Sequence, residues 1–322
     1  MGILAKIGKW AIITILYFNS ILNAQDLDDL NFGTDETFEV MTWNIEWFPK
    51  NDQITVDYVT QIIQALDIDL LAIQEVDDID MFDQMLNGLP EYTGYLESAW
   101  FAGLAYIYKT DVIEINDIYE IYTTSPYWSA FPRSPMVMDL NFMGENIKII
   151  NNHFKCCGDG LIQTELLYEC NEDENRYLTA LNCTENCSGG DCFSTYDEEY
   201  RRLLASQFFQ QYTNTDMNVI ILGDLNDELT DVDSTNVFLD LLEDDSFLFA
   251  DMSIAEGHSD YWSYPSYPSH IDHILLTAPL ESSFNQAHSS IQVLPVDLDF
   301  MNWDQYDFLV SDHRPVLLRL AY

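Results

Sequence analysis

The chain has 322 residues, a length that fits either two average domains or one large α/β domain. Hydrophobic residues make up 48%, and 55 Asp and Glu against 12 Lys and Arg give a formal net charge of −43. A protein this acidic repels other polyanions, which argues against tight non-specific binding to nucleic acid. The charge does not exclude a nucleic acid as substrate, because a bound metal ion inverts the local field.

The first 24 residues have the layout of a signal peptide. Two lysines form a basic start, an apolar run covers residues 10–18, and Ala24 precedes the expected cleavage point. The apolar run is too short to span a bilayer comfortably. We therefore expect a secreted or periplasmic protein without a stable membrane anchor, with a linker over residues 25–37 and one domain over residues 38–322.

All six cysteines fall within residues 156–192, which we interpret as an insertion in that domain. In an exported protein, an even and clustered set of cysteines predicts disulfide bonds. The spacing of Cys183, Cys187 and Cys192 leaves a zinc site as the alternative. Zinc ribbons normally have paired Cys-x2-Cys knuckles, which this segment lacks, so disulfides are favoured. The spacing does not determine which cysteines pair.

Apolar runs predict a mixture of strands and helices without strict βαβ order, which is typical of a layered α+β fold. Residues 219–222 give the clearest pattern, with four apolar residues before Gly223, as in a strand buried on both faces. Strands are also expected over residues 38–46, 70–73, 92–96, 104–108, 112–122, 136–143, 147–153, 271–276, 291–294 and 316–320. Helices are expected over 56–66, 80–89, 237–242 and from a capping box at 195–198.

Polar side chains lie at or just after the ends of several predicted strands, where loops on a rigid base often carry function. Asp224 and Asn226, for example, follow the strand at residues 219–222. The full set of candidates is Asn44, Glu46, Glu75, Arg133, His153, Asp224, Asn226, Asp272, Asp312 and His313.

These residue types suit the hydrolysis of a phosphate ester, which needs a hard cation, a positioned water molecule and donors for developing charge. Glu75 is our choice of Mg²⁺ ligand, with Asn44 and Asp312 close by, because Mg²⁺ takes oxygen ligands. Asp224 can orient or deprotonate the water molecule, and Asn226 can hold a phosphoryl oxygen.

Two histidines and one arginine complete the expected chemistry. Asp272 and His313 can pair, and a carboxylate partner fixes the imidazole tautomer and makes it more basic. His153 can then protonate the leaving oxygen, and Arg133 can bind the phosphate with two hydrogen bonds.

In their order along the chain these motifs resemble the endonuclease/exonuclease/phosphatase superfamily, which includes DNase I, exonuclease III-type enzymes, inositol polyphosphate 5-phosphatases and bacterial sphingomyelinases. The resemblance covers residues 38–320, and six motifs in order carry it where each alone is weak. His153 is similar to the DNase I-like branch, and export suggests a secreted bacterial-type member. The motifs are Asn44-x-Glu46, Gln74-Glu75, Asn152-His153, Gly223-Asp224-Leu225-Asn226, Ile271-Asp272-His273 and Ser311-Asp312-His313-Arg314-Pro315.

The resemblance implies a four-layer α/β sandwich, with two packed mixed β-sheets flanked by helices and the site at one rim. It implies Mg²⁺ or Mn²⁺ as cofactor, with Glu75 as the main ligand. We interpret the chain as a monomeric, metal-dependent phosphoesterase that cleaves DNA or RNA. The alternative is a phosphatase or phosphodiesterase for small or lipid phosphoesters, which the acidic charge and an aromatic stretch at residues 261–268 favour. A non-catalytic binding module would be expected to lack Glu75, Asp224 or His313, and all three are present.

Other features have structural interpretations beside functional ones. His273 alternates with Asp272 and is expected to face away from the site and pack, whereas for His270 the two interpretations are balanced. His258 and His288 are expected to face solvent. The stretch at 261–268 can stack bases, lie in a lipid interface or pack on itself. The acidic pairs Asp77-Asp78 and Asp297-Leu298-Asp299 could each bind a structural Ca²⁺, but neither matches a complete calcium loop.

Overall fold

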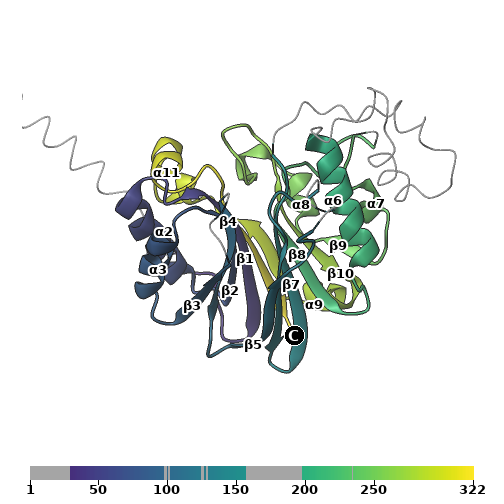
Figure 1. The fold of residues 1–322 in the computed structure, drawn as a ribbon, viewed down its shortest axis with the longest axis horizontal. Coiled ribbons are helices and arrows are strands. Elements are labelled where there is room, and N and C mark those ends of the chain that lie inside the picture. Colours follow the sequence, from purple (N-terminus) through teal and green to yellow (C-terminus); the bar gives the residue numbers. More distant parts are fainter. Residues whose placement is uncertain are drawn as a thin grey trace, which may run out of the picture.

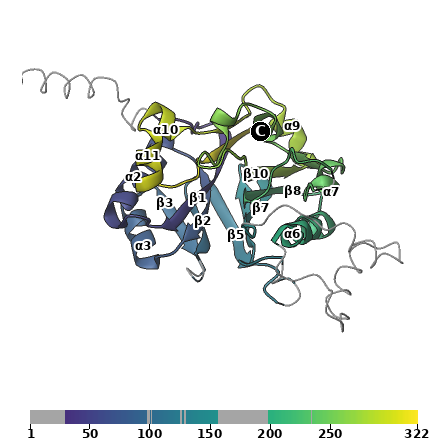
Figure 2. The same ribbon diagram turned by 90° about the horizontal axis from the view of Figure 1, so that it is seen from above.

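Two six-stranded β-sheets pack face to face, with helices on both outer faces (Figure 1). This computed structural model describes residues 30–97, 100, 102–124, 127, 130–156, 198–233 and 235–322. Seen from above, each sheet and its helices form one half of the molecule (Figure 2). The predicted four-layer sandwich is confirmed.

The first sheet has the strand order β11-β12-β1-β2-β4-β3. Its central strands β1 (Thr37–Phe48) and β2 (Leu70–Val76) are parallel, and its other pairs are antiparallel. The outer strands are β3 (Tyr92–Leu96), β4 (Gly103–Lys109), β11 (Ser290–Val293) and β12 (Val316–Ala321). Its helices are α2 (Asp52–Leu66), α3 (Ile79–Asn87), α10 (Val296–Asp299) and α11 (Trp303–Leu309).

The second sheet has the order β5-β6-β7-β8-β10-β9, again with one parallel pair at its centre, β7 with β8. Its strands are β5 (Ile113–Glu120), β6 (Met136–Phe142), β7 (Glu145–His153), β8 (Asn218–Asp224), β9 (Phe247–Phe249) and β10 (Asp272–Thr277). The α-helices of this half are α6 (Glu198–Tyr212), α7 (Leu239–Leu242), α8 (Met252–Ala255) and α9 (Glu281–Phe284).

Strand β8 is apolar at all four positions from 219 to 222 because it packs against a core on each of its faces. Ile220 and Leu222 belong to the core between the two sheets, whereas Val219 and Ile221 belong to the core between the second sheet and its helices. Successive side chains of a strand point to opposite faces, so a strand with a core on each side is apolar throughout.

The parallel pairs bring four strand ends to one rim. In the first sheet Asn44 pairs with Gln74 near the ends of β1 and β2, and in the second His153 pairs with Asp224 at the ends of β7 and β8. A buried hydrogen bond from Gln74 Nε2 to Asn151 Oδ1, at 2.7 Å, joins the two sheets just below this rim. Burial strengthens such a bond and makes its loss costly, so it helps to fix how the sheets are aligned.

Most predicted elements form within one or two residues of the expected bounds. The helix expected over 237–242 is shorter, at Leu239–Leu242, and the short strand β9 and helix α11 were not predicted. Residues 30–36 were expected to be linker, but Leu30 and Phe32 are buried in the core. No helix in the described ranges is long and apolar enough to cross a membrane.

Several predictions fall outside the described residues. They concern the signal peptide at 1–24, the linker before residue 30, the capping box and five of the six cysteines. Cys156, at the start of the expected insertion, lies within the described part.

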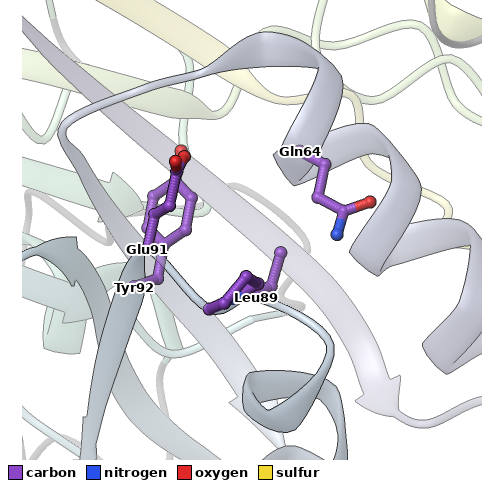
Figure 3. Close-up of a pocket in the computed structure, with 5 residues that line it drawn as sticks. Gln64, Leu89, Glu91 and Tyr92 are labelled. Atoms are coloured by element: carbon purple, nitrogen blue, oxygen red, sulfur yellow. The ribbon is translucent and has the colours of Figure 1, made fainter.

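A pocket lies between α2 and the segment that leads into β3 (Figure 3). It is lined by Gln64, near the end of α2, and by residues 89–92. The strand that follows α2 runs from Leu70 toward Glu75, so this pocket is at the opposite end of the first sheet from the rim. None of the candidate site residues lines it.

Candidate active site

Asn44, Glu75 and Asp224 meet at the rim between the two sheets. Asn44 Nδ2 donates to Asp224 Oδ2 at 2.9 Å and to Glu75 Oε1 at 3.3 Å. The other oxygen of Glu75, Oε2, accepts the backbone N–H of Trp47 at 3.0 Å. The first sheet supplies Asn44 and Glu75 and the second supplies Asp224, so this group exists only when the sheets are packed.

His313 is bound to a buried carboxylate on one side and faces a second on the other. Its Nδ1 lies 2.7 Å from Asp272 Oδ2, and its Nε2 lies 3.7 Å from Asp224 Oδ2. Burial opposes the charged form of His313, but these two carboxylates outweigh that effect and raise its pKa to about 10. The predicted pairing of Asp272 with His313 is therefore present, with Nε2 directed toward Asp224.

The backbone around His313 is fixed by the core of the first half. Its carbonyl oxygen accepts hydrogen bonds from Trp43 Nε1 at 3.1 Å and from the Tyr306 hydroxyl at 2.7 Å. Ser311 Oγ accepts the N–H of His313 and donates to the carbonyl of Asn44. The serine thus ties the loop that carries His313 to the strand that carries Asn44.

His153 is the last residue of β7 and faces the carboxylates of Glu75 and Asp224. Its Nε2 lies 3.4 Å from Asp224 Oδ2 and 3.7 Å from Glu75 Oε1. Burial, together with the positive charges of Arg133 and His313, lowers the pKa of His153 well below its usual value. Its imidazole is therefore neutral near pH 7.

Arg133 and Asn226 lie at the edge of this group. Burial lowers the pKa of Arg133, while the nearby Glu75 and Asp224 oppose that change, and its Nε donates to the carbonyl of Ala102 at 3.0 Å. Asn226 has a left-handed backbone with φ of 55°, and its N–H donates to Asp224 Oδ1 at 3.1 Å.

Asp312 and Glu46 border the site on the side of the first sheet. The N–H of Asp312 donates to Glu46 Oε2 at 2.9 Å, and Asp312 Oδ1 is 3.9 Å from His313 Nε2. Burial raises the pKa of both carboxyl groups. The structure thus brings together every candidate from the sequence: Asn44, Glu46, Glu75, Arg133, His153, Asp224, Asn226, Asp272, Asp312 and His313.

The donors at the centre fit a hard divalent cation. Glu75 and Asp224 present carboxylate oxygens beside the Asn44 amide, and oxygen is the donor that Mg²⁺ and Mn²⁺ prefer. Burial raises the pKa of Asp224 to about 7; His313 opposes this, and the charges of Asp272 and Glu75 add to it. Asp272 Oδ1 is buried without a hydrogen-bond partner among the described residues. A bound cation would reduce the repulsion between these carboxylates and would give the unused buried acceptor a partner.

A second buried group lies on the other face of β10, and the sequence did not reveal it as a group. Asp251 Oδ2 is 2.6 Å from His273 Nδ1 and 3.0 Å from His270 Nε2, and Asp251 Oδ1 accepts the N–H of Ile274. His273 faces away from the site, as predicted. Asp251 follows β9, a strand of three residues with too little periodicity to detect, so no pattern linked it to the two histidines.

The aromatic stretch at 261–268 packs against the site from one side. Ser263 Oγ accepts the N–H of Asp272 at 3.2 Å, and the ring of Tyr264 lies 4.8 Å from that of His313. Trp262 Nε1 donates to the carbonyl of Ile254. Part of this stretch therefore supports Asp272 and His313, in addition to any contact with substrate.

Two of the acidic residues considered for Ca²⁺ have protein partners. Asp297 binds the Arg314 guanidinium through both oxygens, each at 2.6 Å. Asp78 caps α3 by accepting the N–H of Met81 at 3.0 Å. These bonds account for the burial of Asp297 and the position of Asp78 without a metal ion. His258 and His288 are exposed, as predicted.

Comparisons with known proteins agree with this geometry. Residues 41–313 match the Endonuclease/Exonuclease/phosphatase family. No curated protein matches the chain in a sequence search.

Solved structures with this fold include a family member from Bacteroides vulgatus, which is 14% identical with a TM-score of 0.54 over 88% of this chain and 98% of its own. The human Nocturnin catalytic domain with bound sulfate is 15% identical, with a TM-score of 0.54 over 89% and 93%. TDP2 from D. rerio, complexed with a single-strand DNA product, is 10% identical with a TM-score of 0.53 over 89% and 100%. Identities this low show a shared fold only. Because the family match covers most of the described domain, the chain belongs to the endonuclease/exonuclease/phosphatase family of phosphoester hydrolases.

Proposed function

We propose that this protein is a divalent-metal-dependent phosphodiesterase that cleaves the backbone of DNA or RNA. The observation that carries the proposal is the meeting of Glu75, Asp224 and the Asp272–His313 pair at one rim. The fold is shared with a TDP2 whose structure holds a single-strand DNA product, which supports a nucleic acid as substrate.

Glu75 would hold Mg²⁺ or Mn²⁺, with Asp312 on the same side of the site. Asn44 was expected to be a further ligand, but its Nδ2 donates to Glu75 and Asp224 and its Oδ1 accepts the N–H of Glu46, so it would instead position the two carboxylates. The bound ion supplies a positive charge that stabilises the phosphoryl oxygens as negative charge develops on them. The backbone N–H of Trp47 fixes the orientation of the Glu75 carboxylate. The pairing of these residues before any ligand arrives reduces the reorganisation that binding requires.

Asp224 is placed to orient the attacking water molecule and to take its proton. Its raised pKa of about 7 suits a general base near neutral pH. The backbone N–H of Asn226 holds the other carboxylate oxygen of Asp224, and the Asn226 side chain can bind a phosphoryl oxygen.

Asp272 fixes the Nδ1–H of His313, so a protonated Nε2 faces the site and can bind the negative charge of the phosphoryl group. His153 would protonate the leaving oxygen; burial and the positive charges of Arg133 and His313 lower its pKa, which makes its protonated form the stronger acid. Arg133, within electrostatic reach of Glu75 and Asp224, is placed to bind the phosphate.

A plasmid-nicking assay tests the proposal. The protein is incubated with supercoiled plasmid and Mg²⁺, with parallel samples that contain EDTA, the His313→Ala variant, or His288→Ala as a matched control at an exposed histidine. We expect nicking by the wild type and by His288→Ala, and none with EDTA or His313→Ala. An intact plasmid in the presence of folded wild-type protein and Mg²⁺ or Mn²⁺ would contradict nucleic acid cleavage.

The second candidate is a phosphoesterase for small or lipid substrates, and the placement of the positive charges favours it. Most cations of the described part already face a carboxylate, so they offer little to a long phosphate backbone. Hydrolysis of bis(p-nitrophenyl) phosphate or an inositol phosphate without plasmid nicking would support this candidate. The pairs are Lys50–Glu46, Lys109–Asp67, Lys148–Asp139, Arg202–Asp227, Arg314–Asp297 and Arg319–Glu39.

We also propose that the chain is exported, that its signal peptide is removed after Ala24, and that the rest acts as a monomer. The basic start and short apolar run support export. N-terminal sequencing of the protein from the culture medium or periplasm would show whether it begins at Gln25. Gel filtration would test the monomer against the mass of the 37.2 kDa chain less its leader.

A further inference from the structure

At the rim, left-handed residues other than glycine lie in or next to three neighbouring strands of the first sheet: in β1, in β2 and just before β4. Phe48, Val76 and Gly103 pair across β1, β2 and β4, and both pairings show a register shift just before this row. The residue before each of them has a positive φ: 48° at Trp47, 67° at Glu75 and 56° at Ala102. Left-handed backbone is unfavourable for side chains other than glycine, and such strain concentrates at functional sites.

Two of these three residues make a contact in the site that explains their position. Glu75 presents its carboxylate to the centre of the site, and the Ala102 carbonyl holds Arg133. Trp47 contributes its backbone N–H to Glu75, but any residue except proline can do that. Trp47 is 53% exposed, so core packing does not require a tryptophan here, and its left-handed backbone disfavours a bulky side chain.

The position of Trp47 limits what its ring can contact. Its backbone nitrogen is 3.0 Å from Glu75 Oε2, so the ring lies within one side-chain length of the expected metal ligand. A substrate whose phosphate is held at Glu75 and Asp224 would place the group next to that phosphate within reach of the indole. In a nucleic acid, this group is a nucleoside with a planar base, and bases stack on exposed aromatic rings.

We propose that Trp47 stacks on the nucleobase adjacent to the scissile phosphate and makes the enzyme prefer diesters that carry a base at that position. This inference rests on the proposed phosphodiesterase function and deepens it. Trp47 is a specificity-determining residue in this account. The chemistry at Glu75, Asp224 and His313 does not require its ring.

The test compares three substrates: a thymidine dinucleotide and two analogues, each with one of its two nucleosides replaced by an abasic tetrahydrofuran sugar. The variants are Trp47→Ala, Trp47→Phe and, as a matched control, Met143→Ala. Met143 is 65% exposed and lies in the β6–β7 turn, at the opposite end of β7 from His153. Circular dichroism melts establish that each variant is folded.

We expect Trp47→Ala to lower kcat/KM about tenfold on the dinucleotide, which is about 1.4 kcal/mol, mainly through KM. The loss should disappear, to within about twofold, on the analogue that lacks the stacked base, and Trp47→Phe should retain most of the activity. Met143→Ala should match the wild type on all three substrates.

Two results would overturn the stacking but not the proposed function. An equal loss on all three substrates would indicate a structural role for Trp47. No loss on any substrate would show that its ring does not contact a base. Failure of the wild type to cleave any of the three would instead remove the proposed function, and the inference with it. A wild type that cleaves all three while Trp47→Ala behaves identically refutes the stacking and leaves the phosphodiesterase intact.

Discussion

Two buried carboxylate–histidine groups lie on opposite faces of β10, and their carboxylates differ in how completely their hydrogen bonds are made. Asp272 binds His313 through Oδ2, while its Oδ1 has no hydrogen-bond partner within the described ranges. Asp251, on the other face, uses both oxygens to accept from His270, His273 and the N–H of Ile274. Both carboxylates are fully buried.

We propose that this difference separates a catalytic carboxylate from a structural one. A buried carboxylate with all its bonds made stabilises one arrangement, whereas an unused acceptor beside a site costs free energy that a bound ligand can recover. In the Asp251 group, His270 Nδ1 is also buried without a partner in the described part of the chain. Asp272 and His273 are consecutive, and a strand directs consecutive side chains to opposite faces. One strand therefore directs Asp272 toward the first sheet and His273, the partner of Asp251, toward the outer core.

A third carboxylate–histidine pair is exposed rather than buried. His258 Nδ1 lies 3.3 Å from Asp260 Oδ2, but the two side chains are 72% and 71% exposed. Solvent screens such a pair, so it contributes little to stability.

The largest effect is expected for His313→Ala. It removes the protonated nitrogen that faces Asp224, and we expect kcat/KM for bis(p-nitrophenyl) phosphate to fall about 10²- to 10⁴-fold. Steady-state kinetics on folded protein would measure this. An activity within tenfold of the wild type would mean that His313 is not part of the catalytic group.

Asp251→Ala should act on stability. It leaves His273, His270 and the N–H of Ile274 without their acceptor, and breaking a buried pair costs about 3–5 kcal/mol of unfolding free energy. Urea denaturation would measure the loss. Below the melting temperature of the variant, kcat/KM should stay within about fivefold of the wild type, and a selective loss of activity at unchanged stability would contradict the structural assignment.

The Asp251 group should also give stability a pH dependence. Burial opposes the charged form of His273, but Asp251 and the Asp227 carbonyl outweigh it and raise the pKa of His273 above its unfolded value near 6.5. A raised folded pKa contributes stability that is fully present below the unfolded pKa and is lost as pH rises through the folded one.

The stability difference between wild type and His273→Gln should therefore be largest near pH 6 and decrease toward pH 9. Urea denaturation across that range would measure it, and Asp251 stays charged throughout because its own pKa is lowered. A difference that grows with pH would have the wrong sign for this account.

The smallest effect is expected at the exposed pair. His258→Ala should change the unfolding free energy by less than about 0.5 kcal/mol and leave kcat/KM unchanged. The same denaturation and kinetic assays apply. A larger change in either would show that burial does not separate the three pairs.

The sequence predicted the strands with strong apolar patterns and the residues at their ends, because both signals are local. Asp224, for example, follows a run of four apolar residues, and its approach to Asn44 follows from two parallel strand pairs that end at one rim. The lowered pKa of His153 could not be predicted, since it depends on how deeply the rim is buried and on where Arg133 lies.

What the sequence missed depends on contacts between distant segments. Asp251 and His273 are 22 residues apart and meet through β9, which is too short to show a period. The strained row at Trp47 and Glu75 depends on register shifts between three strands, which no pattern in one strand reveals. Helix α11 was missed because it is short, with seven residues, and only Tyr306 among its described side chains is buried.

The most direct test of the central claim is to measure kcat/KM and unfolding free energy side by side for Asp272→Asn and Asp251→Asn. Each substitution removes one buried carboxylate charge in or beside β10 and keeps the shape of the side chain. Asp272→Asn should lose about 10²- to 10⁴-fold in kcat/KM with the smaller change in stability, and Asp251→Asn should lose the larger stability with nearly full activity. Equal effects of the two variants on both quantities would contradict the division between a catalytic and a structural carboxylate.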